Sequence, residues 1–508
     1  MFVTDMLIRI KAIQVHPRLL IILFLSAATL ICGATGRCAT ASSISDSAIH
    51  QMLVNRVNLQ HQATGIVVGI AGPAGNKIIS YGMTSRQNGK PVNGNTIFGI
   101  GSITKVFTAL LLSEAAQNKK LGLNDPVSRF LPLTVSVPRL ADKRITVLDL
   151  ATQTSGLPLR PTNLESDWNQ KQDTVDQMVI HESSEYAGYN VRDLYQFLSD
   201  YKLNHAPGTH YQYSNVGYGL LAIALARAFG TTYPDLIRRL ITNPLDMHQT
   251  REQLTLGMTR RLATGYLFYG GHLISVPREK YGSLQGAAAL YSSANDLLKF
   301  LDAVLAFRKT SLHPAMESMI TIRRPGGMVP PNTRSGSIRI AMAWNIYLDG
   351  AKEIVWKNGS VSGYRSFIGY DPKSRIGVVA LSNGQSPVGV DDIGMHILDP
   401  RIPVSTQVTK TYKGIVLNKT VLERYVGTYR YSPTDSIKVS IYRNHLKVKV
   451  NGTSEIELFA YAKNKFFMKV LNAQIAFKII KNGKASRAIW YQDGQTEVGV
   501  RVQKKHYA

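Results

Sequence analysis

The sequence predicts a large α+β domain followed by a small antiparallel β-barrel. Its 508 residues are enough for two or three domains. Residues 42–400 mix helical and strand-like patterns of apolar residues, whereas the chain after Tyr412 alternates apolar and polar residues with a period of two. A hydrophobic share of 44% and a charged share of 18% are typical of a globular protein. This composition excludes a wholly disordered, collagen-like or polytopic membrane chain.

In the larger domain, the first expected element is a β-hairpin. Gly65–Ile70 and Lys77–Tyr81 would form its strands, and the Gly-Pro-Ala-Gly segment 72–75 its turn. Apolar residues at helical spacing then predict three helices, over Ser102–Leu121, Val216–Ala228 and Ala294–Ala306.

The C-terminal region is predicted to be all β. In Ser436–Val450, apolar side chains alternate with lysines and other polar residues, and residues 443–445 connect two runs. Further short strands are expected at Ile475–Ile480 and Ala488–Gln492, next to Asn-Gly and Asp-Gly turns. Regular hairpins of this kind indicate a small barrel or sandwich over residues 418–508. A linker at 401–417 would join it to the larger domain at 42–400.

The first 41 residues have the pattern of a secretory signal peptide. Basic residues in positions 1–18 precede an apolar run, Leu19–Ala34, and the Ala-Thr-Ala sequence at 39–41 matches a signal-peptidase site. The run is shorter than the roughly 20 residues of a membrane span, although an uncleaved anchor is the alternative. We therefore expect export, to the periplasm or the medium. Cys32 and Cys38, the only cysteines, lie in this leader, so the mature chain would lack a disulfide, a thiol nucleophile and a cysteine-bound zinc.

The formal net charge of +26 requires an explanation. Composition alone leaves nucleic acid open as a partner, but an exported protein rarely meets it. Residues 409–508 carry 19 lysines and arginines against six acidic residues, so much of the excess lies in the predicted barrel. This distribution predicts weak, salt-sensitive contact between the tail and an anionic cell wall or membrane surface, and no binding of nucleic acid.

Ser102 and Lys105 form an S-x-x-K pair at the start of the first predicted helix. Residues three apart share one face of a helix, so the hydroxyl and the amine can meet. Serine is a weak nucleophile without a neighbouring base, and a desolvated lysine can be neutral and act as that base. A second S-x-x-K, Ser199 to Lys202, is interpreted as solvated surface.

Two further motifs follow in order, a Y-x-N at Tyr213–Asn215 and a K-x-G at Lys357–Gly359. Both patterns also occur elsewhere, for example at 442–444 and 120–122. Only one combination of an S-x-x-K, a Y-x-N and a K-x-G, in that order, starts with a serine that opens a helix and ends with a K-x-G on a strand. Together these motifs supply a nucleophile, a base and an oxyanion site for acyl transfer. The alternative to a catalytic role is that Tyr213 and Asn215 only fill a turn before a helix and that Lys357 is an ordinary lysine on a strand.

The motifs lie within longer runs that resemble the serine β-lactamase and penicillin-binding-protein superfamily. The likeness is closest to class C β-lactamases and related D-Ala-D-Ala carboxypeptidases and esterases. The runs include FGIGSITKVFTALLL at 98–112, PGTHYQYSNVGYGLLAIALA at 207–226 and WKNGSVSGYRSFIGYDP at 356–372. This resemblance implies an antiparallel sheet flanked by helices, together with an all-helical part. More weakly, VLERYVGTYRY at 421–431 resembles a lipocalin-like barrel appended to some of these hydrolases.

The resemblance implies catalytic roles for four positions. Ser102 would be the acylated nucleophile and Lys105 its amine partner. Tyr213 would shuttle protons, with its pKa lowered by neighbouring lysines. The backbone N–H groups of Ser102 and Ser360 would form the oxyanion hole.

Substrate binding would fall to other positions. Asn215 would bind the side-chain amide of the substrate, Lys357 would attract a carboxylate, and Gly359 would let a substrate strand approach the backbone. Asn358 stands where class C β-lactamases commonly have threonine, which leaves the carboxylate hydrogen bond open. Arg160 stands where they usually have glutamine. It would favour an acidic or longer substrate if it points inward, and otherwise would be a surface arginine.

Residues 161–191 form a polar insertion, either a lid or specificity loop at the cleft rim or a plain solvated loop. His181 near two glutamates hints only weakly at a metal, so we expect no metal and no cofactor.

The first functional hypothesis is class C-like β-lactam hydrolysis through an acyl-enzyme, because Lys357 and Ser360 accompany the Y-x-N motif. A peptidoglycan D-Ala-D-Ala carboxypeptidase or endopeptidase shares every motif and is the main alternative. A non-lactam esterase, or a sensor that is acylated by penicillins but barely turns over, are further alternatives. The expected substrate is therefore a β-lactam or a peptidoglycan stem peptide.

Overall fold

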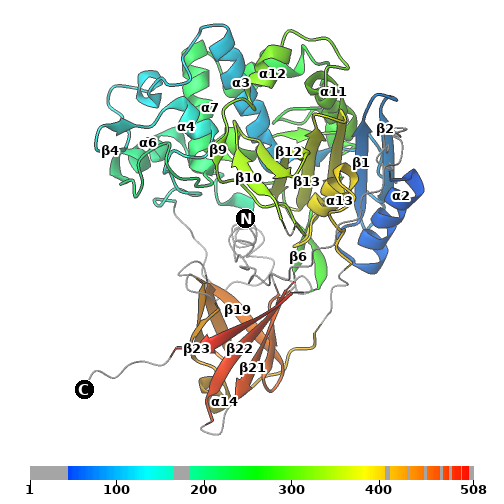
Figure 1. Cartoon of the computed structure of the whole chain (residues 1–508), viewed down its shortest axis with the longest axis vertical. Coiled ribbons are helices and arrows are strands. Elements are labelled where there is room, and N and C mark those ends of the chain that lie inside the picture. Colours follow the sequence, from blue (N-terminus) through cyan, green and yellow to red (C-terminus); the bar gives the residue numbers. More distant parts are fainter. Residues whose placement is uncertain are drawn as a thin grey trace, which may run out of the picture.

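The computed structural model describes residues 44–164, 183–269, 271–333, 335–406, 412–431, 435–450, 455–469, 473–479, 483–492 and 495–502. The predicted leader and most of the polar insertion lie outside the described residues. The described chain forms an α+β domain and, next to it, a closed β-barrel, as the sequence predicts (Figure 1). Within these ranges, no helix has both the length and the apolar character needed to cross a membrane.

The α+β domain is built on an eight-stranded antiparallel sheet with the order β2-β1-β14-β13-β12-β11-β10-β9. The strands are β1 (Gly65–Ala71), β2 (Lys77–Gly82), β9 (Arg324–Pro325), β10 (Ser337–Ile340), β11 (Asn345–Asp349), β12 (Lys352–Val361), β13 (Tyr364–Asp371) and β14 (Ile376–Ser382). The predicted first hairpin is confirmed, because β1 and β2 pair from Gly65 to Ile70. β12 lies inside the sheet between β13 and β11, so the K-x-G motif is on a strand, as expected.

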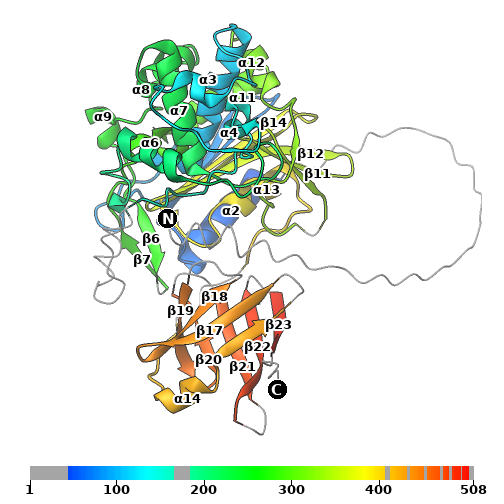
Figure 2. The ribbon, with the colours of Figure 1, turned by 90° about the vertical axis from the view of Figure 1, so that its left-hand side faces the viewer.

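Helices cover both faces of this sheet. α2 (Asp46–Val54) and α13 (Asp391–Leu398) pack on one face and share a core with β1, β13 and β14. α11 (Ala294–Val304) packs on the other face, against β1 and β14. Figure 2 shows the other helices of this domain grouped with α11, on the side of the sheet opposite α2 and α13. The sheet is therefore the middle layer, and its strands carry apolar side chains on both faces.

An all-helical part forms the second half of the domain. Its helices are α3 (Thr104–Gln117), α4 (Val147–Ala151), α6 (Val191–Asp200), α7 (Asn215–Phe229), α8 (Tyr233–Leu236), α9 (Leu256–Thr259), α10 (Gln285–Ala288) and α12 (His313–Ser318). Short 3-10 turns occupy Gly101–Ile103, Val127–Phe130 and Gly282–Leu284, and π turns occupy Asn55–Leu59 and Ile237–Thr242. α3 and α7 are apolar on nearly all sides because they form the buried centre of this part.

The predicted helix over Ser102–Leu121 differs from the structure at both ends. Ser102 lies in the 3-10 turn that leads into α3, which itself begins at Thr104. α3 ends at Gln117, and Lys119 follows with a left-handed backbone (φ 57°), a conformation that no right-handed helix continues. The helices predicted over 216–228 and 294–306 are confirmed as α7 and α11, each within two residues at either end.

The C-terminal domain is a closed eight-stranded antiparallel barrel. After α14 (Lys419–Glu423) its strands are β16 (Gly427–Arg430), β17 (Ser436–Tyr442), β18 (His445–Val450), β19 (Glu455–Ala462), β20 (Lys465–Phe467), β21 (Ala473–Ile479), β22 (Ala485–Gln492) and β23 (Gln495–Arg501). Alternate residues of β17, β18, β19 and β21, together with residues of β16, β20 and β22, form one buried apolar core inside it. His445, expected in a turn, belongs to β18, because Arg443 (φ 52°) makes the tight turn with Asn444 alone.

Short strand pairs complete the domain: β3 (Phe98–Gly99) with β8 (Tyr291–Ser292), β4 (Arg139–Leu140) with β5 (Lys143–Arg144), and β15 (Gly384–Gln385) with β6 (Tyr266–Tyr269) and β7 (His272–Ser275). In both views the β6–β7 hairpin points toward the barrel (Figures 1 and 2). The Lys469 ammonium lies 5.8 Å from the centre of the Tyr269 ring, so this hairpin contacts the barrel.

Candidate active site

Ser102 is held where the sheet meets the helical part. Its 3-10 turn packs against β12, and Ser366 of β13 donates a hydrogen bond (2.8 Å) to the carbonyl oxygen of Ile100. Gly101, just before the serine, has φ +50°, and a Cβ atom there would lie 2.8 Å from the backbone nitrogen of Ser360. Only glycine fits that approach without strain. The turn therefore brings the two backbone segments of the expected oxyanion hole together.

Lys105 lies one helical turn beyond Ser102 and is fully buried. Its Nζ is 3.1 Å from Ser102 Oγ, 2.8 Å from Asn215 Oδ1 and 2.8 Å from the carbonyl oxygen of Ala287. Burial, and then the nearby charge of Lys357, hold the pKa of Lys105 well below its usual value. A neutral amine has two N–H groups, which the two carbonyl oxygens accept. Its lone pair then faces the serine hydroxyl, the arrangement that a general base needs.

Tyr213 completes the immediate surroundings of the serine. Its hydroxyl donates to Ser102 Oγ at 2.7 Å, and the Nζ atoms of Lys105 and Lys357 lie 4.8 and 5.1 Å from its ring centre. Burial raises the pKa of Tyr213, and the hydrogen bond with Ser102 lowers it by less. The net shift is therefore upward, contrary to the expectation that neighbouring lysines lower this pKa, because desolvation of the phenolate is the largest cause. Tyr213 is thus a neutral phenol that can donate a proton.

Asn215 is the first residue of α7, and its place is fixed by the residue before it. Ser214 caps the helix by accepting from the Gly217 amide (2.8 Å), and its own amide donates to Gln153 Oε1 (2.7 Å). Asn215 Oδ1 is directed at Lys105 and accepts its hydrogen bond. The structure therefore gives Asn215 a role in orienting Lys105, in addition to the substrate contact that the sequence predicts.

Lys357 is the second buried lysine, with 2% of its surface exposed. Burial lowers its pKa to about 7, while the charge of Asp391 acts in the opposite direction. Its Nζ lies 3.5 Å from Asn358 Oδ1 and 3.7 Å from Met328 Sδ. In the part of the chain that the structure describes, it forms no ion pair with a carboxylate. An arriving carboxylate would favour the protonated form of Lys357 and pair with it.

The two residues after Lys357 are held by the protein itself. The side-chain nitrogen Nδ2 of Asn358 donates to Asp391 Oδ2 at 2.6 Å, which ties β12 to the start of α13. At Gly359, a Cβ atom would clash with the carbonyl oxygen of Ile100 and with Ser366 Oγ. This glycine is therefore required by the packing of the nucleophile turn on β12, a different reason from the substrate contact that the sequence analysis expects.

Arg160 forms an ion pair with Glu185, 2.5 Å from Nη1 to Oε1, and both side chains are largely buried. Glu185 belongs to the described end of the polar insertion, so its carboxylate offsets the arginine charge locally. The rest of the insertion, with His181, lies outside the described residues. Among the described residues there is no group of three or more metal-binding side chains. The second S-x-x-K is confirmed as surface, with Ser199 and Lys202 exposed at the end of α6.

Sequence reasoning missed three contributors to the site. The Ala287 carbonyl holds Lys105, and Gln153, with a left-handed backbone (φ 57°), holds the Y-x-N loop. Glu279, which follows β7, accepts from the amide (3.3 Å) and hydroxyl (3.2 Å) of Ser362, two residues after Ser360. Burial raises the pKa of Glu279. None of the three carried a clear signal in the sequence, since Gln153 stands among polar residues, between Thr152 and Thr154.

Comparisons with known proteins agree with this geometry. A sequence model of the Beta-lactamase family matches residues 46–399, and one of a domain of unknown function, DUF3471, matches residues 417–504. A penicillin-binding protein of Bacillus subtilis is 24% identical over 476 residues, covering 89% of this chain and 98% of that protein. The D-alanyl-D-alanine-carboxypeptidase/endopeptidase AmpH of Escherichia coli is 26% identical over 326 residues, covering 63% of this chain and 79% of that protein.

A solved structure of a class C β-lactamase from Rhodobacter sphaeroides superposes with a TM-score of 0.56 at 24% identity, over 70% of this chain and 99% of that one. This likeness shows that the α+β domain has the same fold. The family match covers well over half of the chain, and the three motifs meet around Ser102, which is half-buried. The chain therefore belongs to the Beta-lactamase family and is a serine hydrolase.

Proposed function

We propose that this protein is an exported penicillin-binding peptidase that cleaves an amide bond next to a free carboxylate, as in D-alanyl-D-alanine stem peptides. The observation that carries the proposal is that the site contains two buried lysines, Lys105 and Lys357, and that their surroundings differ. Lys105 is held by two carbonyl oxygens with its lone pair toward Ser102, whereas Lys357 has no carboxylate partner among the described residues. One lysine can accept a proton, and the other can bind the carboxylate of a substrate.

The chemistry follows from these positions. Ser102 Oγ attacks the scissile carbonyl and its proton passes to Lys105, while backbone N–H groups at Ser102 and Ser360 stabilise the oxyanion. The neutral hydroxyl of Tyr213 gives a proton to the leaving amine and regains one from Lys105. A water molecule then attacks the acyl-enzyme and passes a proton to Lys105, and Lys105 returns that proton to Ser102 Oγ as the bond between the acyl carbon and Oγ breaks.

A peptide substrate is favoured over a β-lactam by two considerations. The penicillin-binding relative in Bacillus subtilis matches across both domains, and the relative in Escherichia coli is named as a carboxypeptidase/endopeptidase. In addition, burial keeps Tyr213 protonated, so Lys105, whose Nζ lies 3.1 Å from Ser102 Oγ, is the base nearest to the serine among the described residues. Hydrolysis of a penicilloyl-enzyme, in which the leaving amine stays attached near the serine, would be slow with this arrangement.

The predicted leader supports a location outside the cytoplasm, where stem peptides occur. β-Lactam hydrolysis is the second candidate, favoured by the lysine at position 357 followed by Gly359 and Ser360. An esterase is a weaker third, since an ester without a carboxylate would leave Lys357 unused.

One experiment separates these activities. The purified mature protein is incubated with a fluorescent penicillin, and labelling and release are followed by gel and mass spectrometry, while release of D-alanine from a stem peptide is measured in parallel. Slow loss of the Ser102 adduct together with D-alanine release supports the peptidase. Rapid loss without D-alanine release identifies a β-lactamase. No adduct, with cleavage of nitrophenyl esters, identifies an esterase. The Ser102→Ala variant is the control that should remove every one of these activities.

A further inference from the structure

The barrel wall has an opening between β20 and β21. β20 is only three residues long and pairs with β21 from Gln474 to Ala476. One residue further on, Asn464 takes the place of the strand: Phe477 donates to its carbonyl oxygen (2.9 Å), and its side chain donates back to the Phe477 carbonyl oxygen (3.0 Å). Lys478 and Ile479 then continue with β22 as their neighbour. Among the described residues, the last two residues of β21 therefore have no strand neighbour on the β20 side, which leaves an opening in the barrel wall.

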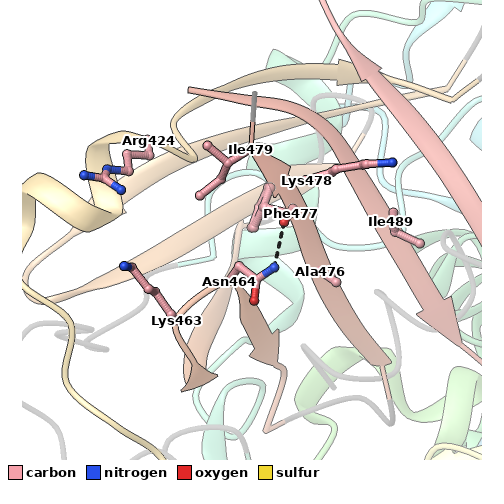
Figure 3. Close-up of a pocket in the computed structure, with 8 residues that line it drawn as sticks. All are labelled: Arg424, Lys463, Asn464, Ala476, Phe477, Lys478, Ile479 and Ile489. Carbon is pink, nitrogen blue, oxygen red and sulfur yellow. Dashed lines mark hydrogen bonds between the residues drawn. The ribbon is translucent and has the colours of Figure 1, made fainter. Parts of the chain in front are cut away.

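A cavity of about 400 Å³ fills this opening (Figure 3). Its lining combines three cations with three apolar side chains, namely Arg424, Lys463 and Lys478 with Phe477, Ile479 and Ile489. Phe477 belongs to the barrel core and is 1% exposed, so the floor of the cavity is continuous with the apolar interior. The cavity is thus basic at its mouth and apolar at its base.

The backbone around the cavity is fixed by hydrogen bonds. The Arg424 carbonyl accepts from the Ala485 amide (2.8 Å) and from Arg501 Nη2 (3.1 Å), which anchors the segment after α14. Tyr425 donates through its hydroxyl to the carbonyl oxygen of Lys463 (2.7 Å), which anchors the β19–β20 turn. The positions from which the cationic side chains leave the backbone are therefore preorganised, which lowers the cost of binding.

The charge of the cavity is not neutralised by the protein. No lining residue is a carboxylate, and among the described residues none of the three cations forms a salt bridge. A concave site lined by one sign of charge concentrates ions of the other sign. Its volume lies in the range of small-ligand sites, large enough for an anionic group and several carbon atoms.

We propose that this opening binds an anionic amphiphile, in which a phosphate or carboxylate group is carried on a short apolar chain. The anionic group would lie beside Arg424 and Lys463, which Figure 3 shows on the same side of β21, and the chain would contact Ile479. This gives the predicted attraction of the tail to anionic surfaces a specific place on the molecule. It is independent of the acyl-transfer site and of the substrate cleaved there.

The test uses the full-length protein and isothermal titration calorimetry with hexyl phosphate. Hexyl glucoside has the same chain without the charge, and inorganic phosphate has the charge without the chain. We expect hexyl phosphate to bind at least about tenfold more tightly than either. Equal binding of hexyl glucoside would overturn the role of the cations, and equal binding of inorganic phosphate would overturn the role of the apolar floor.

Two matched variants locate the site. In the first, Arg424, Lys463 and Lys478 are all changed to glutamine. In the second, Arg430, Lys438 and Lys449 are changed to glutamine, which removes the same charge from β16, β17 and β18, strands that do not adjoin β20 or β21. Binding of hexyl phosphate should weaken at least about tenfold in the first variant and less than about twofold in the second. Equal weakening in both would show diffuse attraction to a basic barrel and overturn the proposal.

If the first triple variant has a lower melting temperature, the single Lys463→Glu variant replaces it, since that side chain is exposed. It should weaken binding, and unchanged binding would count against the site. Co-sedimentation with phosphatidylglycerol or phosphatidylcholine vesicles then distinguishes the source of the ligand. If the protein is retained on the anionic vesicles and Lys463→Glu reduces that retention, the ligand is a membrane lipid. Binding of hexyl phosphate alone indicates a soluble amphiphile.

Discussion

The lysines of the active site and those of the barrel use the same side chain in opposite ways. Lys105 and Lys357 are buried, with 0% and 2% of their surface exposed, and burial lowers the pKa of both. Lys463 and Lys478 are exposed at the mouth of an open cavity. A buried lysine can lose its proton and act as a base, whereas an exposed lysine keeps its charge and attracts anions. The first use costs stability, and the second costs almost none.

The largest effect should come from Lys105→Met. The change removes the base beside Ser102 while keeping an unbranched chain in the same buried space. General-base catalysis is worth roughly 10² to 10⁴ in rate, so kcat/KM should fall by about 10³ or more. Steady-state kinetics with a stem peptide measure this loss. A fall of less than tenfold would show that another group takes the proton of Ser102.

Tyr213→Phe should have the next largest effect. It removes the hydroxyl that donates to Ser102 Oγ at 2.7 Å, and the ring keeps its place beside both lysines. We expect kcat to fall by about 10²-fold, because the leaving amine loses its proton donor. The raised pKa of Tyr213 indicates that its hydroxyl is protonated at rest. Any fall of the wild-type rate at low pH should therefore have another cause, and the same fall should remain in the phenylalanine variant. Loss of this fall in the variant would mean that Tyr213 acts as a phenolate base.

Lys357→Met tests the cost of burial directly. The folded pKa is about 7 and the unfolded value is near 10.5, so below pH 10 the unfolded chain binds more protons than the folded one. The free energy of unfolding of the wild type therefore rises with pH between about 7 and 10. The stability gained over this range is lost again as the pH falls back toward 7. The methionine variant should be more stable by about 2 to 4 kcal/mol at pH 7, and by less at pH 10.

Denaturant titrations of both proteins at pH 7 and pH 10 measure that difference, and kinetics should show a raised KM for substrates with a carboxylate. A variant that is less stable than the wild type at pH 7 would show that Lys357 is charged and well compensated in the folded protein.

Asn215→Asp should have a smaller effect that depends on pH. A carboxylate 2.8 Å from Lys105 Nζ would raise the pKa of the lysine, because it stabilises the ammonium form. More of Lys105 would be protonated at neutral pH, so activity at pH 7 should fall by about tenfold and recover at higher pH. Full pH profiles of kcat/KM measure the shift of the acid limb. Asn215→Ala is the matched control, since it removes the hydrogen bond without adding a charge and should lower activity without that upward shift.

The parts of this contrast that could be predicted from the sequence are those with local signatures. The order of the three motifs identified Ser102, Lys105, Tyr213 and Lys357, which the structure brings close to one another. Period-two alternation after Tyr412 predicted a barrel, and the structure has one. These features depend on residue type and spacing along the chain, which the sequence displays directly.

Other parts depend on contacts between distant segments. The Ala287 carbonyl that holds Lys105 is 182 residues away, and every residue has a carbonyl group, so no sequence signal marks it. The raised pKa of Tyr213 results from burial by several elements together. The ion pair of Arg160 with Glu185, and the opening beside β20, likewise follow from how strands and loops meet in space. Side-chain chemistry was predictable here, but its electrostatic environment was not.

The smallest effect is expected for Lys463→Met, the barrel counterpart of Lys357→Met. The same substitution at an exposed lysine removes no desolvation cost, so the free energy of unfolding should change by less than about 0.5 kcal/mol at both pH 7 and pH 10. Catalysis should be unchanged, because Lys463 lies in the barrel, far along the chain from every residue of the acyl-transfer site. Denaturant titrations under the conditions used for Lys357→Met provide the comparison. If Lys463→Met also stabilised the protein by 2 kcal/mol or more at pH 7, the gain at position 357 would reflect general charge repulsion in a basic protein, and burial of the catalytic lysines would not be its cause.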